Sequence, residues 1–152
     1  MRTVPAAELA DHVGEELGIT EWLTIDQDRI DAFADATLDH QFIHVDPELA
    51  KQTPWGTTIA HGFLTLSLLS HFQFATMLAP ENMVMAVNYG IDRVRFLEPV
   101  RVGSRVRARS RLVEVTEKGA GRWLLKMETA IEIEGIDKPA LVAEPLTMFI
   151  TA

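Results

Sequence analysis

The sequence predicts an α+β domain in which an antiparallel sheet wraps around one long buried helix. Residues 59–78 form the most apolar stretch, interrupted only by scattered polar side chains, which is typical of a helix buried on most sides. After Pro80 the spacing of the apolar residues changes from a helical period to the alternation of strands. A single buried helix followed by a run of strands is an order that suits an α+β arrangement.

Length and composition favour one globular domain spanning residues 1–152. Hydrophobic residues make up 47% of the chain and charged residues 24%, which suits a core without cross-links. The formal net charge of −8 argues against a nucleic-acid partner, because phosphates attract basic surfaces. The absence of cysteine excludes disulfides, thiolate zinc sites and thiol nucleophiles, and it fits a cytoplasmic protein. Because polar residues interrupt residues 59–78, we expect no membrane span.

The N-terminal part is expected to hold a short strand, one helix and a long loop. Residues 22–25 predict the strand, and Asp26 is a suitable N-cap for a helix that ends near Asp39. Residues 39–58 show no sustained period and contain two prolines and a glycine. We therefore expect an ordered loop there, with one helical turn after Asp46-Pro47, and long loops of this kind are often functional.

Strands are expected from Pro80 to the C-terminus. They cover residues 83–89, 93–99, 105–115, 122–134 and 140–150, and Pro145 marks the last as an edge or bulged strand. Every odd position from 105 to 111 is arginine, and a turn at 118–121 can bring these side chains opposite Glu128, Glu132 and Glu134. We favour a charge-balanced, solvated sheet face for this arginine stripe, with anion binding as the alternative.

The densest polar cluster is residues 39–47, where two histidines and two carboxylates lie close together. Three interpretations are open. The cluster can be a surface loop in which Asp46 caps a helix. His40 and His44 can hold a metal if a helix brings this i, i+4 pair to one face. A histidine and a carboxylate can also act as an acid–base pair whose pKa values are tuned by apolar neighbours.

A second feature lies at the start of the predicted buried helix, in residues 56–63. Gly62 falls in the first turn of that helix, where unpaired N–H groups and a partial positive charge suit an anion or a polarised carbonyl oxygen. Glycine also lets a ligand approach the backbone closely. His61 beside it is more often a structural residue than a catalytic one in such a place.

These residues carry a resemblance to a known family. FADATLDHQFIHVDPELA resembles the hydratase motif of the MaoC-like dehydratases, or (R)-specific enoyl-CoA hydratases, and is most similar to their NodN-like branch. IAHGFLTLSLL resembles the start of the family's helix, and VNYGIDRVRFLEPVRVGSRVR resembles its following strands. The resemblance covers nearly the whole chain. It implies the hot-dog fold, a long central helix wrapped by an antiparallel sheet, and a homodimer or dimer of dimers.

The resemblance also implies a reaction, the hydration of a trans-2-enoyl thioester to a 3-hydroxyacyl thioester, or its reverse. Asp39 and His44 would be the acid–base pair, and the Gly62 N–H would stabilise the negative charge on the thioester oxygen. Leu38 stands where the family often has glycine, and Gln41 and Phe42 where it often has Asn-Pro. No metal or redox cofactor is implied, and coenzyme A would enter only as part of the substrate.

Further residues are candidates for substrate binding, and two other functions remain open. The carrier would be coenzyme A or acyl carrier protein, and its phosphates or acyl chain would contact residues among Gln41, Lys51, His61, Asn88, Tyr89, Arg93 and Arg95. A hot-dog thioesterase is one alternative, although residues 61–78 lack the helical carboxylate that many of them use. A non-catalytic protein that binds acyl thioesters is the other.

Overall fold

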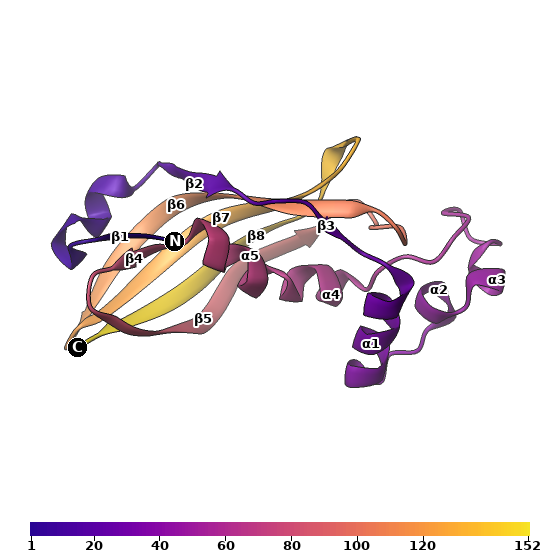
Figure 1. Ribbon diagram of the computed structural model, residues 1–152, viewed down its shortest axis with the longest axis horizontal. Helices are drawn as coiled ribbons and strands as arrows, with labels where there is room; N and C mark the ends of the chain where they lie inside the picture. The colour runs from indigo at the N-terminus through magenta and orange to yellow at the C-terminus, as the bar shows by residue number, and fades with distance from the viewer.

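A curved antiparallel sheet closes around a short interrupted helix in the computed structural model, which describes all 152 residues (Figure 1). The strand order is β2-β6-β7-β8-β5, and β3 also pairs with β6. The predicted α+β arrangement is therefore confirmed. The strands of this sheet are β2 (Glu16–Ile19), β3 (Leu23–Thr24), β5 (Met83–Phe96), β6 (Arg105–Gly119), β7 (Arg122–Ile133) and β8 (Ile136–Thr151).

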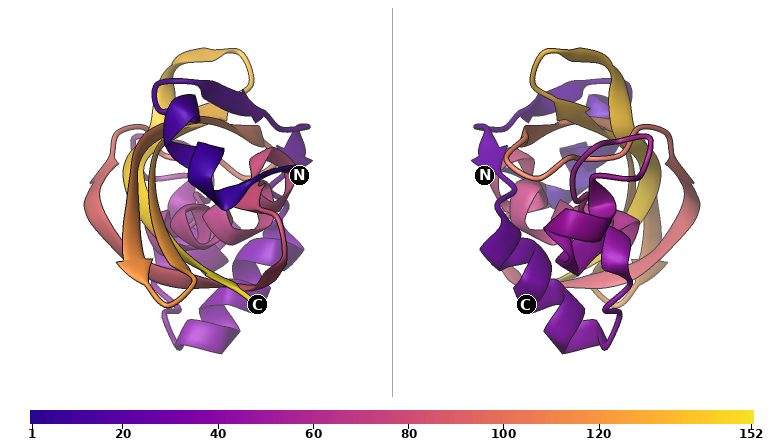
Figure 2. Two further views of the ribbon diagram at one scale, coloured as in Figure 1. Left: turned by 90° about the vertical axis from the view of Figure 1, so that its left-hand side faces the viewer. Right: turned by 90° about the vertical axis from the view of Figure 1, so that its right-hand side faces the viewer.

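The central helix is present but shorter than the sequence indicated. It consists of α4 (Gly62–Ser67) and α5 (Leu69–Thr76), with one turn residue between them, and it lies inside the curve of the sheet (Figure 2). The preceding residues are extended, and Ile59 forms a β-bridge with Arg101. The helix therefore begins at Gly62, which places that glycine at its first position.

One side of the central helix is more open than we expected. Phe63 and Phe74 are 67% and 68% exposed, so the prediction of burial on most sides is wrong for this face. The sheet covers the opposite face, which carries Leu64, Leu68 and Phe72. The apolar sequence of the helix therefore predicts burial correctly for the face that packs on the sheet. It does not show whether the same chain covers the other face.

Three short elements pack at the end of the molecule away from Gly62 and were not expected from the sequence. They are β1 (Arg2–Val4), the 3₁₀ helix η1 (Ala6–His12) and β4 (Leu78–Pro80). The two short strands pair in parallel. These elements have too few residues to show a period, so the pattern of apolar residues did not predict them.

The segment before the central helix is more helical than predicted. It holds α1 (Gln27–Thr37), α2 (Phe42–Val45) and α3 (Pro47–Ala50). Asp26 caps α1 by accepting the Arg29 N–H, as predicted. The Asp46 carboxylate caps α3 in the same way and Pro47 occupies its first turn, which confirms the predicted helical turn. The single turn of α2 inside the expected loop was not predicted.

The long strands pair in the register that the charge pattern predicted. Arg111 lies opposite Glu128 and Arg107 opposite Glu132, and each pair forms an ion pair. The segments 83–89 and 93–99 are not two strands, because β5 runs through to Phe96 with local register shifts. β8 lies between β7 and β5 and is not an edge, although Pro145 does sit beside such a shift.

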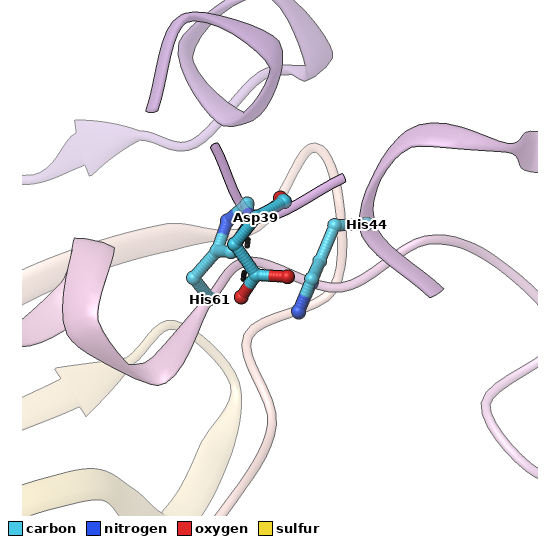
Figure 3. Close-up of side chains that lie close together, drawn as sticks. All are labelled: Asp39, His44 and His61. Carbon is cyan, nitrogen blue, oxygen red and sulfur yellow. Dashed lines mark hydrogen bonds and ion pairs between the residues drawn. The ribbon is translucent and has the colours of Figure 1, made fainter. Parts of the chain in front are cut away.

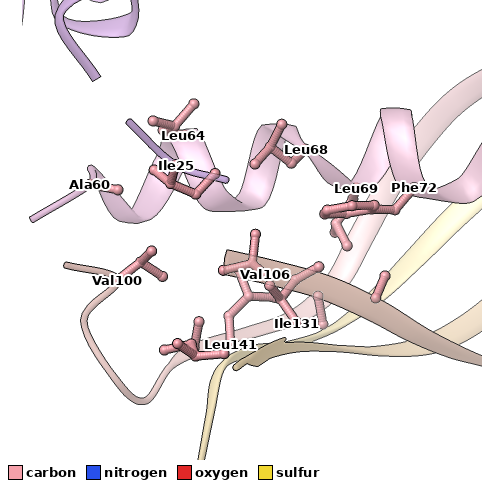
Figure 4. Close-up of a cluster of buried hydrophobic side chains, with 14 of the residues drawn as sticks. Ile25, Ala60, Leu64, Leu68, Leu69, Phe72, Val100, Val106, Ile131 and Leu141 are labelled. Carbon is pink, nitrogen blue, oxygen red and sulfur yellow. The ribbon is translucent and has the colours of Figure 1, made fainter. Parts of the chain in front are cut away.

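The core lies between the central helix and the sheet and has two clusters. The larger surrounds α4 and the start of α5, and it joins them to the residues that flank α1 (Figure 4). The smaller includes Leu9, Leu78 and Phe149 at the opposite end. The larger cluster therefore anchors the N-terminus of α4 and the helices that face it. No helix of the chain is long and apolar enough to span a membrane.

Candidate active site

The end of α1 presents Asp39 to the rest of the site. Leu38 ends this helix in the left-handed conformation, with φ of 62°. Its side chain is exposed and does not pack in the core. A left-handed residue other than glycine costs roughly 1–2 kcal/mol, so packing around it holds the turn. The chain thus reverses at Leu38 as a glycine would allow, and the Asp39 side chain stays 54% exposed.

His44 lies in α2 and is nearly completely buried. Its Nδ1 lies 2.7 Å from the Ile59 carbonyl oxygen, so Nδ1–H donates and Nε2 remains as an acceptor. Burial lowers the pKa of His44 below its ordinary value, and repulsion from His61 adds to this, while the Ile59 carbonyl and Asp39 oppose it. The imidazole is therefore held neutral near pH 7, with one nitrogen free to accept a proton.

His61 holds the other two groups together. It is 3% exposed, its ring stacks on His44 with centroids 3.7 Å apart, and its Nε2 donates to the Asp39 carbonyl oxygen at 2.9 Å (Figure 3). That bond leaves Nδ1 as a buried acceptor without a partner. His61 was expected to be mainly structural, and this geometry gives it a positioning role between the two predicted catalytic residues.

The same three side chains offer ligand atoms within 4.8 Å of one another, which is close enough for a metal ion. Their geometry does not suit one. The lone pairs of an imidazole lie in the ring plane, and the two rings are stacked at only 24°, so these lone pairs cannot converge on one ion. His40, the other candidate ligand, instead pairs with Asp35 at 2.8 Å. The acid–base interpretation fits this cluster better.

A cavity of about 270 Å³ is lined in part by His44. Its other walls include Trp55, Gly62, Thr65 and Phe96. No side chain caps the N-terminus of α4, so its first N–H groups are not taken up by a capping residue. A Cβ on Gly62 would lie 3.0 Å from the Phe96 ring, so a larger residue at this position would require that ring or the helix start to shift.

The remaining predicted binding residues are distributed over several places. The Gln41 N–H donates to the Asp39 carboxylate at 3.4 Å, which places Gln41 beside the predicted acid–base pair. Asn88 and Tyr89 line a separate groove between α5 and β5. Lys51 pairs with Glu48 on the surface. Arg93 lines a groove on the outer face of the sheet, so the structure does not bring it to the site.

Arg95 also lies outside the cluster of Asp39, His44 and His61. One residue that supports the site, Gln27, was not predicted from the sequence. The Arg95 guanidinium donates only to the carbonyl of its neighbour Val94. Gln27, at the start of α1, donates to the His44 carbonyl at 2.7 Å and accepts from the Thr58 hydroxyl at 2.6 Å. This bridge fixes α2 against the strand-like residues before α4. No local spacing in the sequence links positions so far apart.

The fold and this site define a class of protein. The family model described as "MaoC like domain" matches residues 8–134, and the chain belongs to that family, whose fold is the hot-dog. It is a hydro-lyase by class.

Particular relatives agree with this assignment. The chain is 50% identical to Nodulation protein N of Rhizobium leguminosarum bv. viciae over 149 residues, 97% of this chain and 92% of that one. It is equally similar to 3-hydroxyacyl-thioester dehydratase Z of Mycobacterium tuberculosis over 151 residues, 99% of each chain. The solved R-hydratase PhaJ1 of Pseudomonas aeruginosa superposes with a TM-score of 0.75 at 25% identity, over 98% of this chain and 87% of that one.

Proposed function

We propose that this protein adds water across the double bond of a trans-2-enoyl thioester to give an (R)-3-hydroxyacyl thioester, and catalyses the reverse dehydration. One observation carries the proposal. The Asp39 carboxylate and the neutral His44 ring lie side by side (Figure 3). The cavity that His44 lines is also lined by Gly62, the first residue of α4. The relatives named as a dehydratase and an R-hydratase support the same reaction class.

The chemistry follows from this arrangement. A water bound between Asp39 and the His44 Nε2 loses a proton as its oxygen attacks C3 of the substrate. C2 then gains a proton from the same pair, so both additions occur on one face of the double bond. Negative charge develops on the thioester oxygen, and the Gly62 N–H with the helix dipole stabilises it. The net reaction consumes one water and needs no redox step.

The acyl chain has a natural path along the central helix. Gly62 lies against Phe96 at one end of β5, and Ser70 accepts a hydrogen bond from Asn88 further along the same strand. Between these points a groove of about 370 Å³ is lined by residues including Leu66 and Ile91. We place the acyl chain in this groove, which keeps Asn88 and Tyr89 as substrate-binding residues.

The thioester carrier would enter from the opposite side of the site, as coenzyme A or acyl carrier protein. Lys51 lies just after α3 and remains a candidate for a phosphate contact, although it already pairs with Glu48. Arg93 and Arg95 lie on β5 away from the cluster, so they are weaker candidates than the sequence suggested. An acidic chain is expected to need such a local basic contact, because the carrier is an anion.

We also infer that the protein works as a homodimer. β5 is an edge strand of 14 residues, and an exposed edge of this length invites pairing with another strand. Apolar side chains are exposed along it and on the adjoining face of the central helix. A second copy would cover both surfaces at once. The exposed residues are Phe63, Phe74, Val84, Met85, Val87, Tyr89, Ile91 and Phe96.

The thioesterase alternative gains no support from the site. Neither α4 nor α5 carries a carboxylate that could activate water for attack on the thioester carbonyl. The Asp39 and His44 groups instead lie close together, and His44 lines the cavity that Gly62 also lines. A purely binding protein would not need a buried neutral histidine with one unpaired nitrogen beside a carboxylate.

The proposal is tested with crotonyl-CoA and longer trans-2-enoyl-CoAs. We expect loss of the enoyl absorbance without release of free thiol, and a product of R configuration. His40→Gln is the matched control for His44→Gln, because His40 lies in the same segment but pairs on the surface with Asp35. Thiol release would favour a thioesterase instead, and absence of turnover at every chain length would favour the binding protein.

A further inference from the structure

A side-chain amide at the start of α1 is bonded to the backbone of the candidate base His44. Gln27 is the first residue of α1 and is partly buried. Its Nε2 donates to the His44 carbonyl oxygen at 2.7 Å and to the Asp31 carboxylate at 2.8 Å. Its Oε1 accepts from the Thr58 hydroxyl at 2.6 Å. Both partners of Nε2 can only accept, so the surroundings fix the orientation of this amide.

Two of these bonds join three segments that are distant in the sequence. Gln27 and His44 are 17 residues apart, and Gln27 and Thr58 are 31 residues apart. Thr58 is only 1% exposed, so its hydroxyl would have no water to replace a lost partner. We call the chain of bonds from the Thr58 hydroxyl through the Gln27 amide to the His44 carbonyl the amide bridge.

The amide bridge connects the same two segments that hold the His44 ring. The residue after Thr58 is Ile59, and its carbonyl oxygen accepts from the His44 Nδ1 at 2.7 Å. The Ile59 N–H donates to the Ile43 carbonyl oxygen at 3.0 Å. The hydrogen bond made by one ring nitrogen decides which nitrogen of a neutral histidine carries the proton. The amide bridge opposes any slip of residues 58–59 along α2 that would break this ring bond.

The same amide also ties His44 to the helix that presents Asp39. Gln27 lies at the first position of α1, and Asp39 directly follows Leu38, which ends that helix. The Asp39 carboxylate and the His44 ring offer atoms within 4.8 Å of each other. Because one helix carries both the bridge and the carboxylate, the bridge fixes the spacing of the proposed acid–base pair. A misplacement of about 1 Å in such a pair can cost about 10²-fold in rate.

We propose that Gln27 is a positioning residue for the hydration reaction, and that its amide holds His44 in the tautomer with the proton on Nδ1. This inference rests on the proposed function, in which the His44 Nε2 accepts a proton from water. Without the amide, the bond to the Ile59 carbonyl loosens and the ring shifts towards the Nε2–H tautomer, which free neutral histidine favours in water. In that tautomer Nε2 cannot accept a proton, so the rate falls although the substrate still binds.

The kinetic test uses Gln27→Leu and Gln27→Glu with crotonyl-CoA. Leucine has no hydrogen-bonding group, whereas an ionised glutamate has nearly the shape of glutamine but cannot donate to the His44 carbonyl. Both variants are expected to lower kcat by about 10–10²-fold at neutral pH and to change KM by less than about twofold. Asp31→Ala is the matched control, because it removes an exposed partner of the same amide and leaves both bonds of the bridge. It should keep the wild-type kcat.

The other end of the bridge provides a second test. Thr58→Val removes the hydroxyl that the Gln27 amide accepts from, and we expect a smaller fall in kcat than in Gln27→Leu. The double variant should be no slower than Gln27→Leu alone, because residues of one hydrogen-bond network do not act additively. Fully additive losses would contradict a shared bridge.

Nitrogen NMR of the histidine rings measures the tautomer directly, with His44→Gln identifying the signal. The wild-type protein should show a protonated Nδ1 at His44, and both Gln27 variants should lose this preference. A tautomer that is unchanged in the folded variants overturns the inference, even if kcat falls, because Gln27 would then be only structural. An unchanged kcat, or an equal loss in Asp31→Ala, also overturns it while hydration stands. Failure of the wild-type protein to hydrate any enoyl-CoA would instead overturn the proposed function.

Discussion

Two regions of this protein bring carboxylates and nitrogen bases together, and they do so in different ways. On the outer face of β6 and β7, four arginines meet glutamates across the sheet, for example Arg107 with Glu132 at 2.6 Å. In the site, Asp39 lies beside two buried histidines that are held by backbone carbonyls. In this ladder of ion pairs on β6 and β7, every one of the four arginines pairs with a carboxylate. In the site, the His44 Nε2 has no such partner.

The difference teaches where chemistry can arise. Exposed ion pairs are well solvated and are each worth at most about 1 kcal/mol, so they shape the surface rather than a reaction. The buried His44 imidazole is kept neutral, because burial and the neighbouring His61 ring both lower its pKa. If the site carries the chemistry, substitutions in the site should have large effects on rate, and substitutions in the ladder should have only small effects on stability.

The largest expected effect comes from removing either proton-transfer group. His44→Gln and Asp39→Asn should each lower kcat by about 10²–10⁴-fold, because each removes a group that moves a proton. Enoyl absorbance measures kcat, and circular dichroism checks the fold. Wild-type kcat in both folded variants would contradict their assignment, while His40→Gln should retain activity.

Gly62→Ala should have the next largest effect. The added methyl group meets the Phe96 ring at 3.0 Å, and we expect part of this crowding to be relieved by a shift of the first turn of α4, which carries its N–H away from the thioester oxygen. We expect kcat to fall by about 10²-fold or more, as for loss of one oxyanion donor. Combining it with Phe96→Leu should restore part of kcat, and no recovery in the folded double variant would argue against this steric cause.

His61 should act through its neighbours. In His61→Leu, the bond to the Asp39 carbonyl and the stacking on His44 are both lost, so kcat should fall by roughly tenfold. His61→Gln keeps a donor and should recover part of this activity. Without the repulsion from His61, the pKa of His44 should rise, and the acid limb of the pH–rate profile should move to higher pH. An unchanged limb would show that His61 is only structural.

The pH dependence of the wild-type protein provides a related prediction. Because the pKa of His44 is lowered by burial, the acid limb of kcat/KM should lie below the ordinary value of 6.5. The same shift affects stability, since the unfolded chain binds this proton more readily. The His44 contribution is therefore full above the unfolded pKa and is lost as pH falls through the folded pKa. An acid limb above 6.5 in the rate profile would contradict the neutral base.

The smallest effect is expected from the ladder. Burial raises the pKa of Glu132, but its bonds to Arg109 and Arg107 outweigh this and leave it lowered. Glu132→Gln should cost about 1 kcal/mol or less of unfolding free energy, and less in high salt, with kcat unchanged. Thermal melting and the hydration assay measure the two quantities. A large fall in kcat would contradict the conclusion that the ladder takes no part in the reaction.

The sequence was most informative where a pattern repeats. Alternation in β6 and β7 predicted both strands and their charge register, because one face is buried and fixes the pairing. The caps at Asp26 and Asp46 were also predictable, because their chemistry is local. The breaks at Gly62 and Thr76 were not, since an apolar run looks the same in helix and in extended chain.

The site was predicted less evenly. Asp39 and His44 stood out as a dense polar cluster and by family resemblance, and the structure brings them together, although their roles remain a prediction. The stacking of His61 on His44 and the bridge from Gln27 depend on tertiary contacts between distant segments. Arg93 also depended on tertiary structure. Its charge suggested a contact with the anionic carrier, but its side chain lines the groove on the outer face of the sheet.

The most direct measurement is the stereochemistry of hydration in D₂O. If Asp39 and His44 act together on one face, NMR of the product should show one diastereomer, with R configuration at C3 and deuterium at C2 added syn to the hydroxyl. Anti addition, or deuterium scrambled over both positions at C2 within a single turnover, would contradict the claim that this pair delivers both the water and the proton.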